Sequence, residues 1–498
     1  MIMKFKSLNI ILTMLVVVML AFVSCSKDDA EIAQLTVPTT DISFLPEGGS
    51  SDLSFTTNDS WTLLNGATWL HLSQGTGEAG ENTITLTADD NPTGFSRKVV
   101  INLETKNGKA RRITVTQTGN LYPSFNLTPK PADMTGMSST ATELFAKMIL
   151  GVNFGNTMEL TGIMPDPTEA NVKFLKQLGF NMVRLPCSFN YRGGAKDSPT
   201  SKISDDYLDK VKQIVQWCVE NDMYVMVNIH WDGGWLESKK IDDVDTNNYN
   251  PNSSRKEIVN AKQKALWEQI ATKLRDFDEH LFFASSNEPN AETADEMKVL
   301  LSYHKSFITA VRSTGGRNTY RTLVLQGHED YISPADFAAL NDPTPNRLAY
   351  EWHNYTPSSM TILGSDRADG GWDNVRFYWG AGNHVAGLEK GIDRNCSYGE
   401  EDELIAHYNA IKTKWVDKGI PCLMGEFSSN RWTATSKFQP EDLDKHNKSV
   451  DDWYTFQVKH SKATGSVPCL WETGGLYNRA TNVIKDQRAY DAIKAGLN

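Results

Sequence analysis

Eight short apolar runs, separated by stretches with helical periodicity, constrain the fold of residues 141–498 more than any other feature of this sequence. The runs lie at Ile149–Phe154, Met182–Pro186, Tyr224–Ile229, Leu281–Ala284, Thr322–Leu325, Leu348–Tyr350, Cys422–Gly425 and Val467–Leu470. The stretches between them include 168–178 and 205–220, whose apolar residues recur at helical spacing. Eight strands that alternate with helices over about 360 residues are typical of an α/β fold, the (β/α)8 TIM barrel. An open doubly wound sheet is the alternative.

Residues 35–119 follow a different pattern, in which apolar and polar residues alternate with a period of two. Ile42-x-Phe44 and Leu53-x-Phe55 are examples, and Asn107-Gly108 has the composition of a two-residue hairpin turn. These features predict a small all-β, immunoglobulin-like sandwich. The Gly75–Gly80 run fits G-x-G-x-x-G, but a strand pattern follows it, so we do not interpret it as a dinucleotide-binding loop. Residues 120–140 lack periodicity and are predicted to be a linker to the barrel at 141–498.

The first 24 residues have the composition of a targeting segment. Lys4 and Lys6 precede the apolar run Ile10–Val23, and the segment that ends at Cys25 resembles a bacterial lipobox. This resemblance implies that Cys25 carries lipid and anchors the protein to a membrane. Residues 27–29 resemble an export tag, so we expect a surface-exposed outer-membrane lipoprotein. A plain secretory signal or an anchor helix is the alternative.

Composition excludes several classes of function. The formal net charge of −11 and the pI of about 5.5 argue against nucleic acid as a partner, because phosphates require a basic surface. The cysteines other than Cys25 have irregular spacing, which is no disulfide framework, and no Cys-x-x-Cys or His-rich cluster indicates zinc. We therefore expect a monomer that needs no metal and no cofactor.

Polar and aromatic residues follow six of the eight runs. They are Arg184, His230-Trp231, Asn287-Glu288, Glu351-Trp352-His353-Asn354-Tyr355, Glu426 and Trp471-Glu472. In a parallel barrel all these positions lie at one end, where active sites are found. Two glutamates there, one protonated and one ionised, are what the hydrolysis of a glycosidic bond requires. A single glutamate after a strand is usually solvated; the joint occurrence predicts an active site.

This set resembles glycoside hydrolase family 5, and in particular its subfamily 4 of endo-acting β-glucanases. The matching positions are Arg184, His230, Asn287, Glu288, His353, Tyr355, Glu426 and Trp471. Gly151–Glu159, which includes Asn156, is similar to the family's first-strand segment. Residues 35–119 resemble the BACON module of glycan-degrading proteins, through Asn58–Trp61 and Thr114–Gln117. That module implies either glycan binding or a spacer.

The family resemblance implies a role for each matching residue. Glu288 is expected to be the general acid/base and Glu426 the nucleophile, with carboxyl groups about 5–5.5 Å apart. Arg184 is expected to keep Glu426 ionised, because a nearby cation lowers a carboxylate's pKa. The resemblance also implies that Asn287 binds the sugar 2-hydroxyl and that Tyr355 bonds to Glu426. His230 and His353 are expected to bind hydroxyls or orient the glutamates, and Trp471 to lie beneath the reacting sugar ring. Further substrate contacts are expected from Asn156, Trp231 and Trp235.

The resulting hypothesis is a retaining endo-β-1,4-glucanase acting on cellulose-type chains, mixed-linkage glucan or xyloglucan. A xylanase or mannanase of the same fold is one alternative. A non-catalytic glycan-binding lipoprotein and an anchored adhesion protein are two others. Asn354 and Glu472 depart from the residues that family members often have at these positions, and Glu472 is a rival carboxylate to Glu426.

Overall fold

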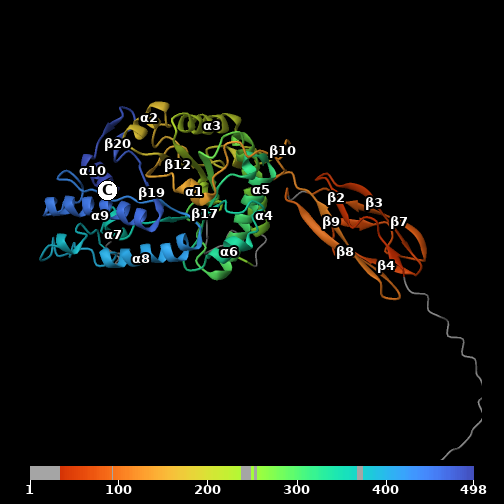
Figure 1. Cartoon of the computed structure of the whole chain (residues 1–498). Coiled ribbons are helices and arrows are strands. Elements are labelled where there is room, and N and C mark those ends of the chain that lie inside the picture. Colours follow the sequence, from red (N-terminus) through yellow and green to blue (C-terminus); the bar gives the residue numbers. More distant parts are fainter. Residues whose placement is uncertain (1–33, 92–93, 237–247, 252–254, 367–373) are drawn as a thin grey trace, which may run out of the picture. The chain divides into compact units, whose positions relative to one another are not determined.

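The computed structural model describes residues 34–91, 94–236, 248–251, 255–366 and 374–498, which form two compact units (Figure 1). One unit holds the residues up to Asp90 together with Arg97–Gln117, and the other holds Asn91–Ser96 and Thr118–Asn498. The targeting segment 1–24 and Cys25 lie outside the described residues. Within the part of the chain that is described, no helix is long and apolar enough to cross a membrane.

The first unit is a sandwich of two β-sheets, as its alternating pattern predicts. The strands are β1 (Leu35–Thr36), β2 (Asp41–Phe44), β3 (Gly49–Thr57), β4 (Trp61–Leu64), β5 (Leu70–Leu72), β6 (Thr76–Gly77), β7 (Gly80–Ala88), β8 (Arg97–Thr105) and β9 (Ala110–Gln117). They are ordered β1-β3-β7-β5 in one sheet and β2-β9-β8-β4-β6 in the other. Alternate side chains such as Leu53, Phe55, Ile101 and Leu103 are buried in its core.

The second unit is a closed barrel of eight parallel strands, which confirms the predicted (β/α)8 fold. The strands are β11 (Gly151–Asn153), β12 (Met182–Cys187), β13 (Tyr224–Ile229), β14 (Leu281–Ala284), β16 (Leu323–Gln326), β17 (Leu348–His353), β18 (Cys422–Glu426) and β19 (Ser466–Leu470). They pair in this order, and β19 closes the barrel on β11. All eight apolar runs of the sequence are strands. The sixth, β17, continues three residues beyond its predicted end at Tyr350.

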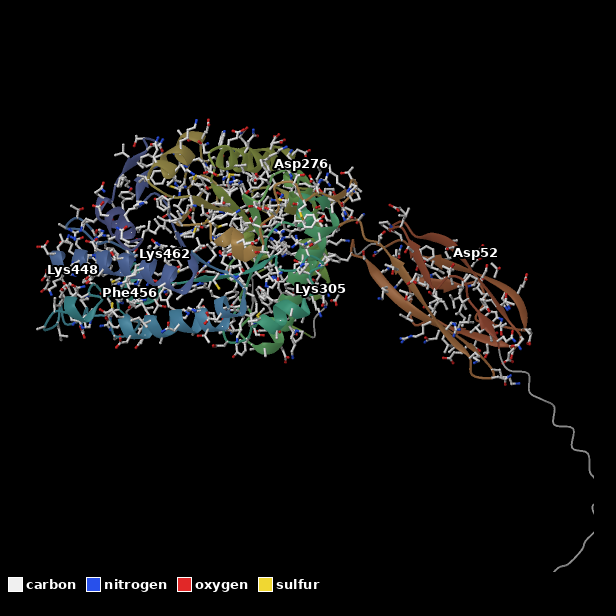
Figure 2. The ribbon with its side chains drawn as sticks, in the orientation of Figure 1. Asp52, Asp276, Lys305, Lys448, Phe456 and Lys462 are labelled. Atoms are coloured by element: carbon white, nitrogen blue, oxygen red, sulfur yellow. The ribbon has the colours of Figure 1, made fainter. Side chains whose placement is uncertain are left out.

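Helices of the second unit follow the strands along the chain (Figure 1). They are α2 (Glu169–Gln177), α3 (Asp205–Glu220), α4 (Arg255–Leu274), α5 (Ala294–Ser313), α6 (Pro334–Ala339), α7 (Ser358–Thr361), α8 (Glu401–Lys414), α9 (Leu443–Thr464) and α10 (Gln487–Ala495). In α9, Phe456 packs on Trp379 and Trp453 is buried, whereas Lys448 and Lys462 are exposed (Figure 2). This division between an apolar and a charged face holds each helix on the barrel.

Two apolar clusters separate the inside of the barrel from its outside. Side chains that point inward, such as Met226, Phe282 and Leu423, join Leu144 and Phe145 of the short helix α1 (Ala141–Phe145) in one cluster. Side chains that point outward pack under the helices in the larger cluster. Along each strand the two directions alternate. The inward-pointing residues at the carboxyl ends of the strands therefore form the site described below.

Residues 120–140, which we predicted to be a linker, are part of the barrel unit. The buried carboxylate of Glu268 on α4 accepts bonds from the Ser124 hydroxyl (3.0 Å) and from the amides of Phe125 (2.6 Å) and Asn126 (3.2 Å). Lys130 forms an ion pair of 2.9 Å with Asp276, which Figure 2 labels. The sequence pattern missed this docking because the segment binds through main-chain amides, which leave no periodic signature.

We expect the free energy of unfolding of a protein without the first unit to depend on the residue at which it begins. A protein beginning at residue 119 keeps all three donors to Glu268, whereas one beginning at residue 131 leaves this buried carboxylate without them. Removing the partners of a buried charge should lower the free energy of unfolding by roughly 2–4 kcal/mol. Thermal unfolding of the two proteins would measure the difference, and equal midpoints would show that the docking contributes nothing.

Candidate active site

The predicted site residues lie together at the carboxyl end of the barrel. Arg184 is on β12, and His353 and Glu426 end β17 and β18. His230, Asn287, Glu288, Tyr355 and Trp471 follow the ends of their strands by one to four residues. Six of these side chains line one cavity of about 470 Å³: His230, Asn287, Glu288, Tyr355, Glu426 and Trp471.

The two glutamates face each other across this cavity. One carboxylate oxygen of Glu288 and one of Glu426 lie within 4.8 Å of each other. Such a separation leaves no room for a water molecule between the carboxyl groups, and it agrees with the spacing of about 5–5.5 Å that direct attack on the sugar requires. The side chain of Glu288 is 54% exposed, and that of Glu426 is 6% exposed. Glu288 has a backbone φ of 41°, a strained conformation of the kind that clusters at active sites.

Arg184 organises the floor of the site from a fully buried position. Its Nη1 donates to Glu426 Oε1 at 2.7 Å, and its Nη2 donates to Asn287 Oδ1 at 2.6 Å. The bond to Asn287 uses the amide oxygen, so the amide Nδ2 remains available as a donor. Arg184 also pairs through Nε with Glu351 at 2.8 Å. One guanidinium thus orients three groups of the site.

Glu351 is a site residue to which the sequence analysis assigned no role. Its side chain is completely buried, and its Oε1 lies 2.8 Å from Arg184 Nε and 3.1 Å from His353 Nε2. The other ring nitrogen of His353, Nδ1, lies 2.7 Å from Glu288 Oε1. Both nitrogens of His353 are therefore engaged by carboxylates. The signals in the sequence were its place in the segment after the sixth run and its two-residue spacing from His353, which puts both side chains on one face of a strand.

The charges of this cluster set the protonation of its members. Burial opposes the charge on His353, but Glu426, Glu288 and Glu351 outweigh it and raise the pKa of His353 to about 10. Burial raises the pKa of Glu288, but its hydrogen bond and charge interaction with His353 outweigh this and hold that pKa below its usual value. The proton shared by these two residues therefore lies on His353 in the free protein.

The expected effect of Arg184 on Glu426 is present but does not decide the pKa. Burial is the largest influence, and it raises the pKa of Glu426 above its usual value. His353 and Arg184 lower it, and Glu288 raises it. Arg184 lowers this pKa as expected, but burial of the carboxylate, which the sequence cannot show, outweighs it. Arg184 still stabilises the ionised form of Glu426, through an ion pair of 2.7 Å.

A β-bulge turns Glu426 into the site. In the pairing of β17 with β18, Trp352 is opposite Met424, but His353 is opposite Glu426, so Gly425 is an extra residue. Without this shift, Glu426 would point toward the helices, because alternate residues point to opposite sides. A Cβ atom on Gly425 would lie 2.1 Å from Glu351 Oε1, so only glycine fits beside the buried carboxylate.

Four further predicted residues, Trp471, His230, Tyr355 and Trp231, make different contacts around the two glutamates. Trp471 stacks with His230 at a centroid distance of 5.4 Å and an interplanar angle of 9°. Burial, Arg184 and His353 lower the pKa of His230 well below its usual value, so this ring is neutral. Tyr355 donates to Glu426 Oε2 at 2.8 Å. Trp231 is 59% exposed, which suits a platform for a distant sugar.

Two residues predicted to contact substrate lie outside the lining of the cavity of the two glutamates. The indole nitrogen of Trp235 donates to buried Asp232 at 2.9 Å, and the ring packs against the core. The backbone amide of Asn156 bonds to the Glu159 carboxylate in a turn with φ of 60°. Neither residue lines the cavity that holds the two glutamates.

The two departures noted in the sequence have structural explanations. Glu472 is buried, pairs with Arg479 at 2.9 Å, and accepts bonds from the amides of Gly474 and Leu476. It holds the loop after β19 and does not line the cavity of the two glutamates. Asn354 bonds through its Nδ2 to Gln457 at 2.9 Å and is also buried.

A TIM barrel with two facing glutamates, an arginine beneath them and an aromatic platform beside them defines a glycoside hydrolase. The sequence model described as "Cellulase (glycosyl hydrolase family 5)" matches residues 135–475, and the chain belongs to this family. A second model, described as "Viral BACON domain", matches residues 34–120.

Three relatives illustrate the similarity. The chain is 28% identical to the xyloglucan-specific endo-β-1,4-glucanase BoGH5A of Bacteroides ovatus, over 98% of this chain and 96% of that protein. It is similar to the structure of a Bacteroides ovatus family 5 xyloglucanase in complex with a XXXG heptasaccharide (27% identity, TM-score 0.63, 93% of this chain and 100% of that chain). It is also similar to a xyloglucan-specific β-1,4-glucanase from a ruminal metagenomic library in complex with XXLG (29% identity, TM-score 0.60, 72% of this chain and 96% of that chain).

Gly425→Ala should reduce hydrolysis by about 100-fold, because displacements of about 1 Å at a catalytic group have effects of this size. The new Cβ would force Glu351 away from Arg184 and His353. Gly382→Ala is the matched control, since a Cβ there has nothing within 4 Å and the residue lies outside the cavities. Steady-state kinetics of both variants would test this, and equal activities would show that Glu351 has no part in positioning.

His353 should make stability depend on pH. Its pKa is about 10 in the folded protein and about 6.5 in an unfolded chain. The stabilisation is therefore complete below about pH 6.5, declines as the pH rises, and is lost above about pH 10. The melting temperature should fall more steeply between pH 7 and 10 in the wild type than in His353→Gln. Parallel curves for the two proteins would contradict this assignment.

Proposed function

We propose that this protein is a retaining endo-β-1,4-glucanase whose preferred substrate is xyloglucan. The observation that carries the mechanism is the separation of less than 4.8 Å between oxygens of Glu288 and Glu426. Xyloglucan is favoured among β-glucans because the three relatives described above are xyloglucanases. The endo-β-1,4-glucanase BoGH5A of Bacteroides ovatus aligns over nearly the full chain.

In the first step, Glu426 attacks the anomeric carbon while Glu288 gives a proton to the departing glycosidic oxygen. In the second, Glu288 takes a proton from water, which displaces Glu426 from the sugar. Arg184 and Tyr355 hold the carboxylate of Glu426 in place through hydrogen bonds. Asn287 offers its Nδ2 to the 2-hydroxyl, and Trp471 supports the reacting ring.

The proton needed for the first step lies on His353 in the free protein, 2.7 Å from Glu288. A bound glucan would cover the exposed side of Glu288 and remove water from it. Loss of water disfavours the charged carboxylate and raises its pKa. Substrate binding would thereby move the proton from His353 Nδ1 to Glu288, at the time when the leaving oxygen requires it.

Cleavage within the glucan chain is supported by further space at Glu288. Another cavity of about 420 Å³, which Asn290, Gln326 and His328 line, shares Glu288 with the cavity that Glu426 lines. An open site with room beyond the point of cleavage suits an internal bond of a long polymer.

A panel of soluble polysaccharides would test this function. We expect rapid release of reducing ends and rapid loss of viscosity with xyloglucan, and slower cleavage of mixed-linkage glucan and carboxymethylcellulose. A preference for xylan or mannan would make the protein a xylanase or mannanase of the same fold. Binding without release of reducing ends would make it a glycan-binding protein. Slow loss of viscosity relative to reducing-end release would contradict the endo mode.

We also propose that lipid on Cys25 anchors the protein at the outer membrane with its catalytic unit exposed, and that the protein is monomeric. The lipobox-like segment supports the anchor. Cys25→Ala should move the protein from the membrane fraction to the soluble fraction without changing turnover. Protease treatment of intact cells would then test surface exposure, and size-exclusion chromatography would test the monomer. A membrane-bound Cys25→Ala variant would exclude the lipid anchor.

A further inference from the structure

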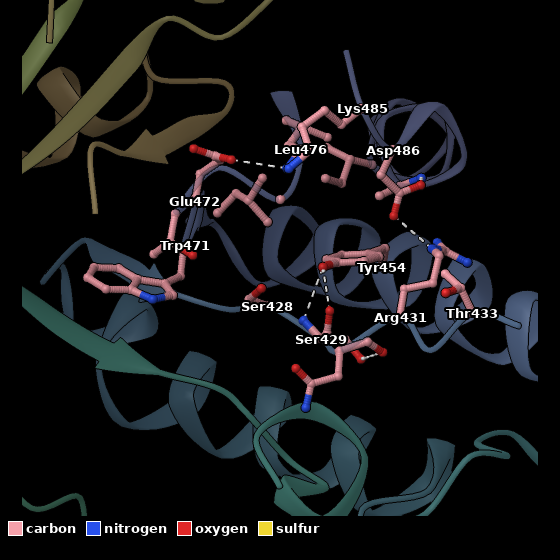
Figure 3. A pocket seen from close by; sticks show the side chains of 16 residues that line it. Ser428, Ser429, Arg431, Thr433, Tyr454, Trp471, Glu472, Leu476, Lys485 and Asp486 are labelled. Atoms are coloured by element: carbon pink, nitrogen blue, oxygen red, sulfur yellow. Dashed lines mark hydrogen bonds and ion pairs between the residues drawn. The ribbon is translucent and has the colours of Figure 1, made fainter. Parts of the chain in front are cut away.

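Another cavity, of about 550 Å³, adjoins the cavity of the two glutamates, and we call it the lateral pocket (Figure 3). It lies between the loop after β18, the loop after β19 and helix α10. Four residues line both cavities: Ser428, Asn430, Trp471 and Thr473. In Figure 3 the Trp471 indole lies at one end of this lateral pocket, and Thr433 and Asp486 lie at the other. The two cavities therefore share part of their walls.

The lining of the lateral pocket suits a sugar. Leu476 and Ala489 provide apolar parts of the lining, and Arg431, Lys485 and Asp486 provide polar groups. Asp486 accepts from Arg431 Nε at 2.7 Å, and Lys485 Nζ donates to the Gly474 carbonyl at 2.6 Å. These bonds hold the polar walls in place before any ligand arrives. A preformed pocket with an apolar surface and a few fixed polar groups is typical of ligand sites.

The orientation of the reacting sugar, which rests on the proposed function, decides what reaches this pocket. C1 must lie at Glu426, and the 2-hydroxyl must lie at Asn287, after the fourth strand of the barrel. In a pyranose ring, C5 and its C6 substituent lie on the side opposite to C2. The C6 group therefore points away from Asn287, toward the loops after the seventh and eighth strands, where Ser428 and Thr473 form the boundary of the lateral pocket.

We propose that the lateral pocket binds a branch sugar linked to C6 of the glucose unit in the reacting subsite. In a β-1,4-glucan, successive glucose units are rotated by about half a turn, so a branch on the next unit points to the opposite side. The pocket thus serves the branch on the reacting unit itself. The enzyme accordingly cleaves after a branched glucose as well as after an unbranched one.

An aryl glycoside fixes the register, because the sugar that carries the aryl group must occupy the reacting subsite. The test compares a chloronitrophenyl β-cellobioside with the same compound carrying an α-1,6-linked xylose on the aryl-bearing glucose. We expect the wild type to cleave the branched compound with kcat/KM within about 10-fold of the unbranched one. A kcat/KM for the unbranched compound that exceeds that for the branched one by more than about 1,000-fold would overturn the proposal. Failure with both compounds would instead overturn the proposed function.

A variant that fills the pocket gives an independent measurement. Ser429 lines the lateral pocket but not the cavity of the glutamates, and its backbone bonds to Tyr454 do not depend on its side chain. Ser429→Trp should lower kcat/KM for the branched compound at least 10-fold and leave the unbranched compound within twofold. Lys437→Trp, exposed on the same loop and outside the pocket lining, is the matched control and should change neither value. Equal losses for both compounds in Ser429→Trp would contradict a branch site.

Discussion

Glu426→Ala is expected to abolish turnover while the protein remains folded. Loss of a nucleophile removes the covalent step, and the rate should fall by roughly 10⁴-fold or more. The fold should persist because Arg184 keeps its ion pair with buried Glu351 at 2.8 Å. Kinetics on xyloglucan, together with thermal unfolding, would separate the chemical loss from a structural one.

Azide provides a sharper readout of the same variant. It can enter the space left by the carboxylate and attack an activated aryl glycoside directly, which gives a glycosyl azide of inverted configuration. Glu472→Gln is the control, because Glu472 is a buried partner of Arg479. That variant should melt at a lower temperature, and azide should not change its products. Normal turnover by Glu426→Ala would show that another group is the nucleophile.

Glu288→Ala is expected to slow hydrolysis of polysaccharide by about 10²–10⁴-fold, the usual contribution of a general acid/base. The effect should depend on the leaving group. The phenolate of a phenol with a low pKa departs without receiving a proton, whereas a sugar alkoxide does not. Formation of the covalent intermediate from an activated aryl substrate should therefore be nearly normal, and its hydrolysis should be slow. Pre-steady-state kinetics would show this as a burst of released phenol.

Azide needs no general base, so it should accelerate turnover of activated substrates by Glu288→Ala. Its product should have retained configuration, because azide attacks the intermediate on Glu426. An inverted product from Glu288→Ala, with a retained one from Glu426→Ala, would exchange the two assignments. Equal rate losses for aryl and polysaccharide substrates would exclude Glu288 as the acid.

The strands were readable from the sequence because each is short, apolar and buried on both sides. Such runs need no information about their neighbours, and all eight are strands of the barrel. The position of the site was also readable, because parallel strands place their carboxyl ends together. The docking of residues 124–126 on Glu268 was not readable, because main-chain amides give no pattern of side chains.

Glu351 shows why the end of a strand cannot always be predicted from the residues of that strand alone. A charged residue marks the end of an apolar run, so the sixth run was expected to end at Tyr350. In the structure β17 continues to His353, and Glu351 faces the interior of the barrel. Arg184 and His353 come from distant positions in the sequence to stabilise its charge. A buried carboxylate can be predicted only when its partners are known to be near.

The sequence by itself determined the class of fold, the end of the barrel that carries the site, and the positions of the candidate glutamates, among which the family resemblance favoured Glu288 and Glu426. These depend on local patterns and on the fixed geometry of parallel strands. Only the tertiary structure decided the protonation of the site, since the pKa values of Glu288, His353 and Glu426 depend on mutual distances and burial. It also decided the direction of Glu426, which points into the site because Gly425 forms a bulge beside Glu351. That bulge arises from the register of two strands about 70 residues apart, and register is a property of the assembled sheet.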